Sequence, residues 1–148
     1  SVAFAQSKAN DIPADKLPPE VKAVLEQYVA MLRAGPDVPS VAKAFVAIAG
    51  GGVVNEDGKS LRRDVPDFSL KKDFNGVKFY ADPVSITRVN ATKSGGQGFG
   101  PSAIAGMVYK IWIAKKEGAG GMPAPISIMV PEGHATITTP KVVNIGSL

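Results

Sequence analysis

The spacing of apolar residues in the first third of the chain predicts two amphipathic helices. The first begins after Pro19, whose fixed φ favours a helix start, and ends at Gly35. The second begins at Ser40, a good N-cap residue, and ends at the three glycines 50–52. Each helix carries a single apolar stripe at helical spacing. The stripe residues are Val21, Val24, Leu25, Tyr28 and Leu32 in the first helix, and Val41, Ala44, Phe45 and Ile48 in the second.

Beyond residue 76 the pattern changes to the alternation that is typical of strands. In the longest apolar run, Tyr109, Ile111 and Ile113 share one face, whereas Lys110 and Trp112 share the other. This alternation predicts central strands of an antiparallel sheet that packs one face against the helices. Gly- and Pro-rich connections separate five such segments. The predicted strands are 77–80, 84–92, 104–115, 125–130 and 135–145.

Shorter segments connect these elements. Residues 53–54 are expected to form a short strand that enters a tight turn over 55–58, and 69–74 a brief helical turn. The glycine-rich segments 94–102 and 118–123 lie between predicted strands, so we interpret them as hairpin loops rather than phosphate cradles, which need a following helix N-terminus.

Composition narrows the chemistry. The chain has 148 residues, no Cys and one His, so thiolate nucleophiles, iron–sulfur clusters, disulfides and sites with two imidazoles are excluded. We therefore expect no cofactor and no metal site. A chain of this length usually forms one domain. We assign that domain to 18–148 and a flexible N-terminal segment to 1–17.

Charge and the N-terminal sequence bear on partners and compartment. The net charge is +4, but the basic residues are scattered in pairs beside acidic ones, so we expect no nucleic-acid partner. We also expect no membrane span, because no apolar run reaches the ~20 residues that one needs. Ala3-Phe4-Ala5 matches the small-x-small pattern that precedes a signal-peptidase cut. This pattern predicts export, to the bacterial periplasm or out of the cell.

The order of the elements, together with the patterns at 79–83, 106–112 and 144–148, resembles the cystatin-like, nuclear transport factor 2 (NTF2)-like superfamily. The resemblance covers 18–148. It implies an α+β fold in which two N-terminal amphipathic helices pack on a curved antiparallel sheet of five to six strands that wraps a long helix into a cone. It also implies a pocket between sheet and helices. Some members use that pocket for catalysis on steroids or polyketides, and many use it for binding or dimerisation alone.

In ketosteroid-isomerase-like members the pocket holds a carboxylate base and an oxyanion site made of a phenol and a protonated acid. The predicted strands from residue 84 onward carry no carboxylate, so no catalytic set can be carried over. The acids that remain are expected to be solvated charges, and the single histidine to be a surface turn residue. These residues are Glu26, Asp64, Asp67, Asp73 and His134.

Aromatic residues are the remaining candidates for ligand contact, although aromatic residues at such spacing usually fill a core. They are Tyr28, Phe45, Tyr80, Tyr109 and Trp112. The favoured hypothesis is a non-catalytic exported domain that binds a small apolar ligand or a protein partner, with a homodimer as an open alternative. The second hypothesis is a small pocket enzyme, an isomerase or cyclase that uses Tyr and Asp/Glu. The third is an accessory module whose sheet is its interface. A buried acid with a raised pKa, in an apolar cavity beside a Tyr, would favour the enzyme.

Overall fold

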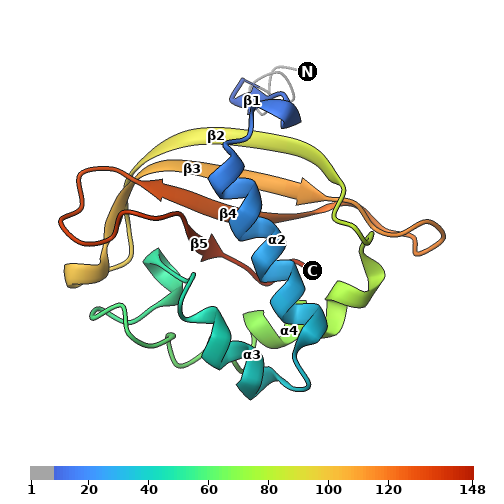
Figure 1. The fold of residues 1–148 in the computed structure, drawn as a ribbon, viewed down its shortest axis with the longest axis horizontal. Helices are drawn as coiled ribbons and strands as arrows, with labels where there is room; N and C mark the ends of the chain where they lie inside the picture. The colour runs from blue at the N-terminus through green and yellow to red at the C-terminus, as the bar shows by residue number, and fades with distance from the viewer. Residues whose placement is uncertain (1–8) are drawn as a thin grey trace.

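Helices cover one face of an open, five-stranded antiparallel sheet in the computed structural model, which describes residues 9–148 (Figure 1). The Ala3-Phe4-Ala5 motif lies outside the described residues, so export stays a prediction. The α-helices are α2 (Pro19–Ala34), α3 (Val38–Phe45) and α4 (Ser69–Gly76), and the short 3-10 helices are η1 (Ala14–Lys16), η2 (Gly51–Val53), η3 (Val77–Phe79) and η4 (Gly100–Ser102). The strands are β1 (Asp11–Ile12), β2 (Ile86–Gln97), β3 (Ile104–Ile113), β4 (Ala124–Pro131) and β5 (Lys141–Asn144).

The strands follow one another across the sheet in chain order, β1-β2-β3-β4-β5, and each pairs antiparallel with the next. Ile111 of β3 lies opposite Val89 of β2 and Ile126 of β4. Residues directly opposite one another share a face, so these three apolar side chains form a row beneath the helices. All three are fully buried.

The layer between sheet and helices is filled by large side chains. Tyr28 of α2 and Phe45 of α3 are completely buried, and their ring centroids lie 5.1 Å apart. Burying such residues supplies most of the free energy that favours folding, at roughly 1.5–3 kcal/mol for each large apolar side chain. The largest buried side chains here are Tyr28, Tyr80, Phe45, Leu25, Leu32, Leu70, Ile111, Ile113, Ile126 and Ile128.

The opposite face of the sheet carries a smaller apolar cluster. Met129 and Ile104 are buried there, and Ile137 of the β4–β5 connection packs over them. His134 holds this connection in place. Its Nδ1 accepts the backbone N–H of Ile137 at 2.9 Å, so the ring proton sits on Nε2, which donates to the carbonyl of Pro101 at 2.8 Å. The single histidine is therefore a turn residue, as the sequence predicts.

The antiparallel sheet and the first two helices are confirmed, but helical boundaries differ from the sequence prediction. Helix α3 ends at Phe45, before the glycines 50–52 that the sequence predicts as its end. Helix α3 starts earlier than predicted, because Asp37 rather than Ser40 is its N-cap. The carboxylate of Asp37 accepts the backbone N–H of Ser40 at 2.9 Å. The helical turn predicted at 69–74 is a third α-helix of eight residues.

Predicted strands also differ in extent or type. Strand β2 runs on to Gln97, so it includes the first residues of the segment 94–102, which the sequence predicts to be a hairpin loop. Residues 77–79 continue from α4 as a 3-10 helix, with the N–H of Tyr80 donating to the carbonyl of Val77. The last strand is confined to β5, because the residues after His134 fold into the turn that its ring holds. Residues 9–17, assigned by sequence to the N-terminal segment, contribute β1 and η1.

Replacement of Gly106 tests the close approach of β3 and β4. Gly106 has φ +152°, and a Cβ built there would lie 2.0 Å from the carbonyl oxygen of Val130 on β4. We expect Gly106→Ala to lower the free energy of unfolding by roughly 3 kcal/mol, measured by urea denaturation. Gly96→Ala is the matched control, because a Cβ at that position meets nothing within 4 Å. Equal losses in the two variants would contradict this account.

Candidate functional site

The structure brings four of the five candidate aromatic residues together in the filled layer. Tyr28, Phe45 and Tyr80 are fully buried, and Tyr109 packs partly buried against the same core. Trp112 lies on the other face of the sheet. None of the five lines either of the two adjoining surface depressions described below. The buried residues therefore fill the space that a pocket between sheet and helices would occupy.

The Trp112 ring is covered by two cationic side chains. The guanidinium of Arg88 lies 4.4 Å from the ring centroid, and the ammonium of Lys110 lies 5.1 Å from it. Arg88 also donates from Nε to both carboxylate oxygens of Asp11, at 3.0 and 2.9 Å. Stacking and ion pairing thus fix the guanidinium over the indole and tie β1 to β2. The indole is half-buried, with Lys110 exposed beside it.

A buried acid and phenol meet on the helix side. Asp73 of α4 is fully buried, so the expectation that it is a solvated charge is wrong; Glu26, Asp64 and Asp67 are exposed, as expected. The hydroxyl of Tyr28 donates to its Oδ2 at 2.7 Å. The backbone N–H groups of Gly146 and Leu148 donate to Oδ2 at 3.0 Å and to Oδ1 at 2.9 Å.

The two groups shift each other's titration. Burial raises the pKa of the Asp73 carboxyl, and the hydrogen bond from Tyr28 is the largest of the effects that oppose this rise. Burial, followed by the charge of Asp73, holds the pKa of the Tyr28 phenol well above its ordinary value. Because three donors from the protein already occupy both carboxylate oxygens, the arrangement joins α2, α4 and the chain after β5.

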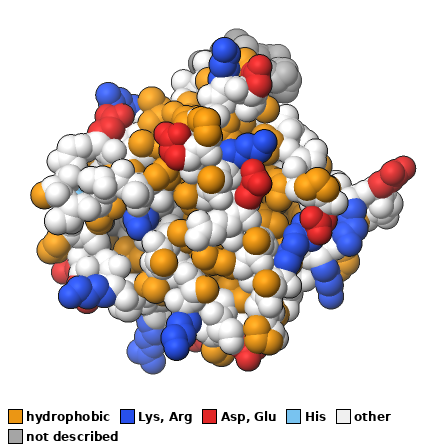
Figure 2. All heavy atoms as spheres, in the orientation of Figure 1, with side chains coloured by type: hydrophobic (Ala, Val, Ile, Leu, Met, Phe, Trp, Pro, Cys, Tyr) orange, Lys and Arg blue, Asp and Glu red, His pale blue; other side chains and the backbone are white. Residues whose placement is uncertain are grey.

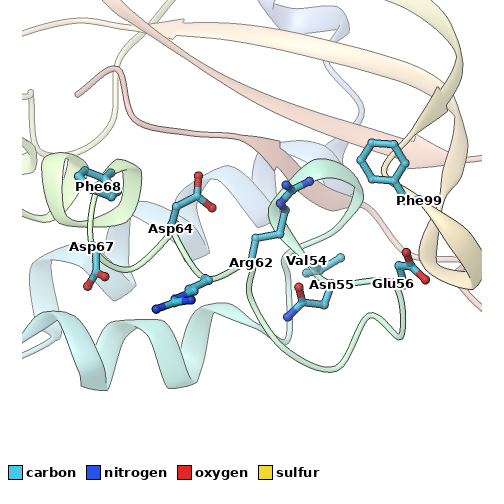
Figure 3. A pocket seen from close by; sticks show the side chains of 9 residues that line it. Val54, Asn55, Glu56, Arg62, Asp64, Asp67, Phe68 and Phe99 are labelled. Carbon is cyan, nitrogen blue, oxygen red and sulfur yellow. The ribbon is translucent and has the colours of Figure 1, made fainter.

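A surface depression lies elsewhere, between residues 54–68 and the loop before η4. It has a volume of about 530 Å³. Phe68 and Phe99 stand at its opposite ends, and Arg62 and Asp64 lie between them (Figure 3). Phe68 is 71% exposed and Phe99 65%, which is unusual for phenylalanine. We call this depression the Phe68–Phe99 groove. Its lining residues are Val54, Asn55, Glu56, Arg62, Arg63, Asp64, Asp67, Phe68 and Phe99.

Ser102 positions the wall that carries Phe99. Its buried hydroxyl donates to the carbonyl of Asn55 at 2.8 Å, and its N–H donates to the carbonyl of Glu56 at 2.9 Å. The guanidinium of Arg62 then lies 5.9 Å from the centre of the Phe99 ring. These bonds join the turn after η2 to the glycine-rich loop, so residues more than forty positions apart face one another across the groove.

A second depression of about 530 Å³ adjoins the first. It shares Asp67 and Phe68 with the groove and continues along α4 to Asn75 and Gly146. Phe68 thus stands between two depressions, with Lys71 and Lys72 along the second. Exposed aromatic rings with charged residues of both signs around them are suited to bind an apolar group that has polar neighbours.

Sequence reasoning missed both phenylalanines of the groove. Phe99 stands alone within the glycine-rich segment, and Phe68 follows an acidic turn before α4. Neither belongs to a helical or alternating apolar pattern. A large apolar residue outside any such pattern is the signal that could have identified them, because nothing in the local sequence predicts its burial.

No protein-family model, curated protein or solved structure matches the chain. Within residues 9–148 no group of three or more His, Cys, Asp or Glu side chains could hold a metal ion. Among the helices of that same stretch, none is long and apolar enough to cross a membrane.

Removal of the Tyr28 hydroxyl tests the buried acid. The folded-state pKa of Asp73 lies above its ordinary 3.8, so its contribution to stability is complete below that value and is lost as the pH rises through the folded pKa. Tyr28→Phe removes a hydrogen-bond donor that lowers the pKa of Asp73 and so opposes the effect of burial. We expect it to cost about 1–3 kcal/mol at around pH 8 and less near pH 4, because this hydrogen bond favours the ionised form of Asp73, which a higher pH populates more.

The measurement is urea denaturation across that pH range, with Tyr109→Phe as the matched control. The Tyr109 hydroxyl has no hydrogen-bond partner among the residues that the structure describes, so its loss should be small at every pH. An equal loss for Tyr28→Phe at both ends of the range would argue against an ionising partner.

Ser102→Ala tests how the groove is held. The substitution leaves the carbonyl of Asn55 without its hydroxyl donor, and we expect a loss of about 1–3 kcal/mol in the free energy of unfolding. The control is Ser94→Ala, whose hydroxyl bonds only to the nearby Gly96, and we expect a change below about 0.5 kcal/mol. A Ser102→Ala protein as stable as the parent would show that the hydroxyl does not hold the groove wall.

Proposed function

We propose that this protein is a non-catalytic binding domain that recognises a protein partner through the Phe68–Phe99 groove. The single observation that supports this proposal is the pair of exposed phenylalanine rings at the two ends of this depression. Exposed aromatic residues carry much of the binding energy at protein interfaces, because they contribute a large apolar area at little cost in side-chain entropy. The charged side chains between and around them would form the polar rim.

A protein partner is favoured over a small apolar ligand. Such a ligand would need a cavity between sheet and helices, and that layer is filled by Tyr28, Phe45 and Tyr80. The depressions lie at the surface instead, and the second continues the groove along α4. An open depression of this length suits an extended segment of another chain.

The relation to the NTF2-like superfamily belongs to the same proposal. Two features support it. The strands follow one another across the sheet in chain order, and the long helix α2, which comes between β1 and β2 in the sequence, lies across the sheet (Figure 1). That the sheet curves around α2 into the cone of this superfamily is likewise proposed. Many members of that superfamily bind partners or form dimers, which agrees with a binding role. Fold alone carries no function, so the argument depends on the groove.

The enzymatic alternative would use the buried pair of Tyr28 and Asp73. It has the residue types and the raised carboxyl pKa, but both carboxylate oxygens accept hydrogen bonds from the protein itself. Asp73 is also fully buried, whereas a general base must lie within hydrogen-bond reach of the substrate proton. No observation therefore favours catalysis at this pair over its role as a link between segments.

Selection from a displayed library of random peptides tests the proposal. Enriched peptides should share an apolar residue with polar neighbours, and their affinities can be measured by fluorescence polarisation. We expect Phe68→Ser and Phe99→Ser each to weaken binding roughly tenfold or more, because each removes one apolar wall.

Met122→Ser is the matched control, since Met122 is 82% exposed at the tip of the β3–β4 hairpin and does not line the groove. Absence of enrichment, or unchanged affinity in the Phe68→Ser/Phe99→Ser double variant, would overturn the proposal. Sedimentation equilibrium distinguishes the homodimer, because a dimer that the double variant abolishes would identify the groove's partner as a second copy.

A further inference from the structure

Three cationic side chains converge on a separate depression at the end of α2. Arg33, Lys78 and Lys116 line it, and no acidic residue does. Its volume is about 370 Å³. The remaining lining residues are Leu32, Gly35, Phe74 and Val77, so the depression combines an apolar floor with a cationic rim. We call it the cationic cleft.

Backbone pairing brings these residues together from three parts of the chain. The N–H of Lys116 donates to the carbonyl of Phe79, and the N–H of Ala81 donates to the carbonyl of Ala114, each at about 3.0 Å or less. Tyr80 pairs with Lys115 between these two bonds. The end of β3 is therefore fixed against η3, with the end of α2 beside them.

The side chain of Arg33 is held by contacts within the protein and forms one wall of the cleft. Its Nη2 donates to the carbonyl of Ala81 at 3.0 Å, and its Nη1 lies 3.9 Å from the carboxylate of Asp82. Asp82 is 72% exposed, so this long ion pair neutralises the guanidinium only weakly. Glu117, which follows Lys116, is the other acidic residue nearby in the sequence, and it is exposed.

Lys78 and Lys115 have aromatic neighbours instead of carboxylates. Across residues 9–148, no carboxylate lies within 4.0 Å of the ammonium of Lys78, Lys115 or Lys116. The ammonium groups of Lys78 and Lys115 lie 5.3 and 5.9 Å from the centre of the same Phe79 ring. Figure 2 shows Lys and Arg side chains gathered on the side of the molecule from which the β3–β4 hairpin projects.

Cationic side chains that line one depression repel one another, and Asp82 offsets only the charge of Arg33. An anion bound near Lys78 and Lys116 relieves the repulsion that remains. The apolar floor adds a second requirement. Phe74 is half-buried, and its exposed part, with the edges of the nearly buried Leu32 and Val77, forms a surface that favours an apolar group over water. The cleft is therefore suited to a ligand with an anionic head and a short apolar body.

We propose that the cationic cleft binds a phosphate head group carried on a short alkyl chain. The head group lies between the ammonium groups of Lys78 and Lys116, and the alkyl chain lies against Phe74. Lysine binds phosphate as a point charge, without the planar geometry that a guanidinium requires. A volume of about 370 Å³ accommodates one head group with a few methylenes, so a single soluble molecule fits better than a bilayer surface.

Isothermal titration calorimetry with n-hexyl phosphate tests this proposal, with inorganic phosphate and hexyl glucoside as the two partial probes. We expect hexyl phosphate to bind at least tenfold more tightly than either, and its affinity to fall as salt is raised. The Lys78→Ala/Lys116→Ala double variant should weaken hexyl phosphate binding roughly tenfold. Lys78→Arg/Lys116→Arg, which keeps the charge, should retain most of the affinity.

Lys22→Ala is the matched control, because Lys22 lines a different depression together with Glu26, and it should bind hexyl phosphate like the parent. If hexyl glucoside bound as tightly as hexyl phosphate, the claim that the cleft recognises a charged head group would be wrong. If inorganic phosphate bound as tightly as hexyl phosphate, the claim that the apolar floor contributes to binding would be wrong. Unchanged binding in the folded Lys78→Ala/Lys116→Ala protein would overturn the site. Binding to anionic lipid vesicles without binding to hexyl phosphate would contradict the proposal that the ligand is a soluble molecule. The Phe68→Ser/Phe99→Ser protein should still bind hexyl phosphate, which separates this test from that of the groove.

Discussion

The buried carboxylate of Asp73 is the constraint on which the arrangement of the helices depends. A carboxylate removed from water requires hydrogen-bond donors at both oxygens. The Tyr28 hydroxyl and the backbone N–H groups of Gly146 and Leu148 supply them. These donors belong to α2 and to the chain after β5, whereas the acid belongs to α4. Apolar contacts have no direction, but hydrogen bonds select one position, so the acid fixes how α4 sits between helix and sheet.

The position of α4 connects the two proposed binding sites. Phe68 immediately precedes this helix and stands between the two large depressions, whereas Lys78 follows it in η3 and lines the cationic cleft. The proposed partner groove and the proposed phosphate site are thus at opposite ends of one short helix. Both depend on the same buried acid, although their ligand chemistry differs.

Because the layer between sheet and helices is filled by side chains, the candidate binding sites lie at the surface. Tyr28, Phe45 and Tyr80 occupy the space that a ligand pocket between sheet and helices would need, and their burial contributes stability instead. On the other face, Arg88 and Lys110 cover the ring of Trp112. The aromatic residues with the clearest sequence pattern are therefore structural, whereas the two phenylalanines of the groove have no pattern at all.

The sequence by itself determined the class of the fold, because helical and alternating periodicities depend only on neighbouring residues. The stripe that includes Leu25 and Leu32 predicted α2, and the alternation that includes Ile111 predicted β3. Nothing in the local sequence distinguishes Asp73 from an exposed acid, nor places Phe99 opposite Phe68. Burial of a charge and the meeting of distant side chains depend on contacts between segments, and the hydrogen bonds and packing that create those contacts exist only in the tertiary structure.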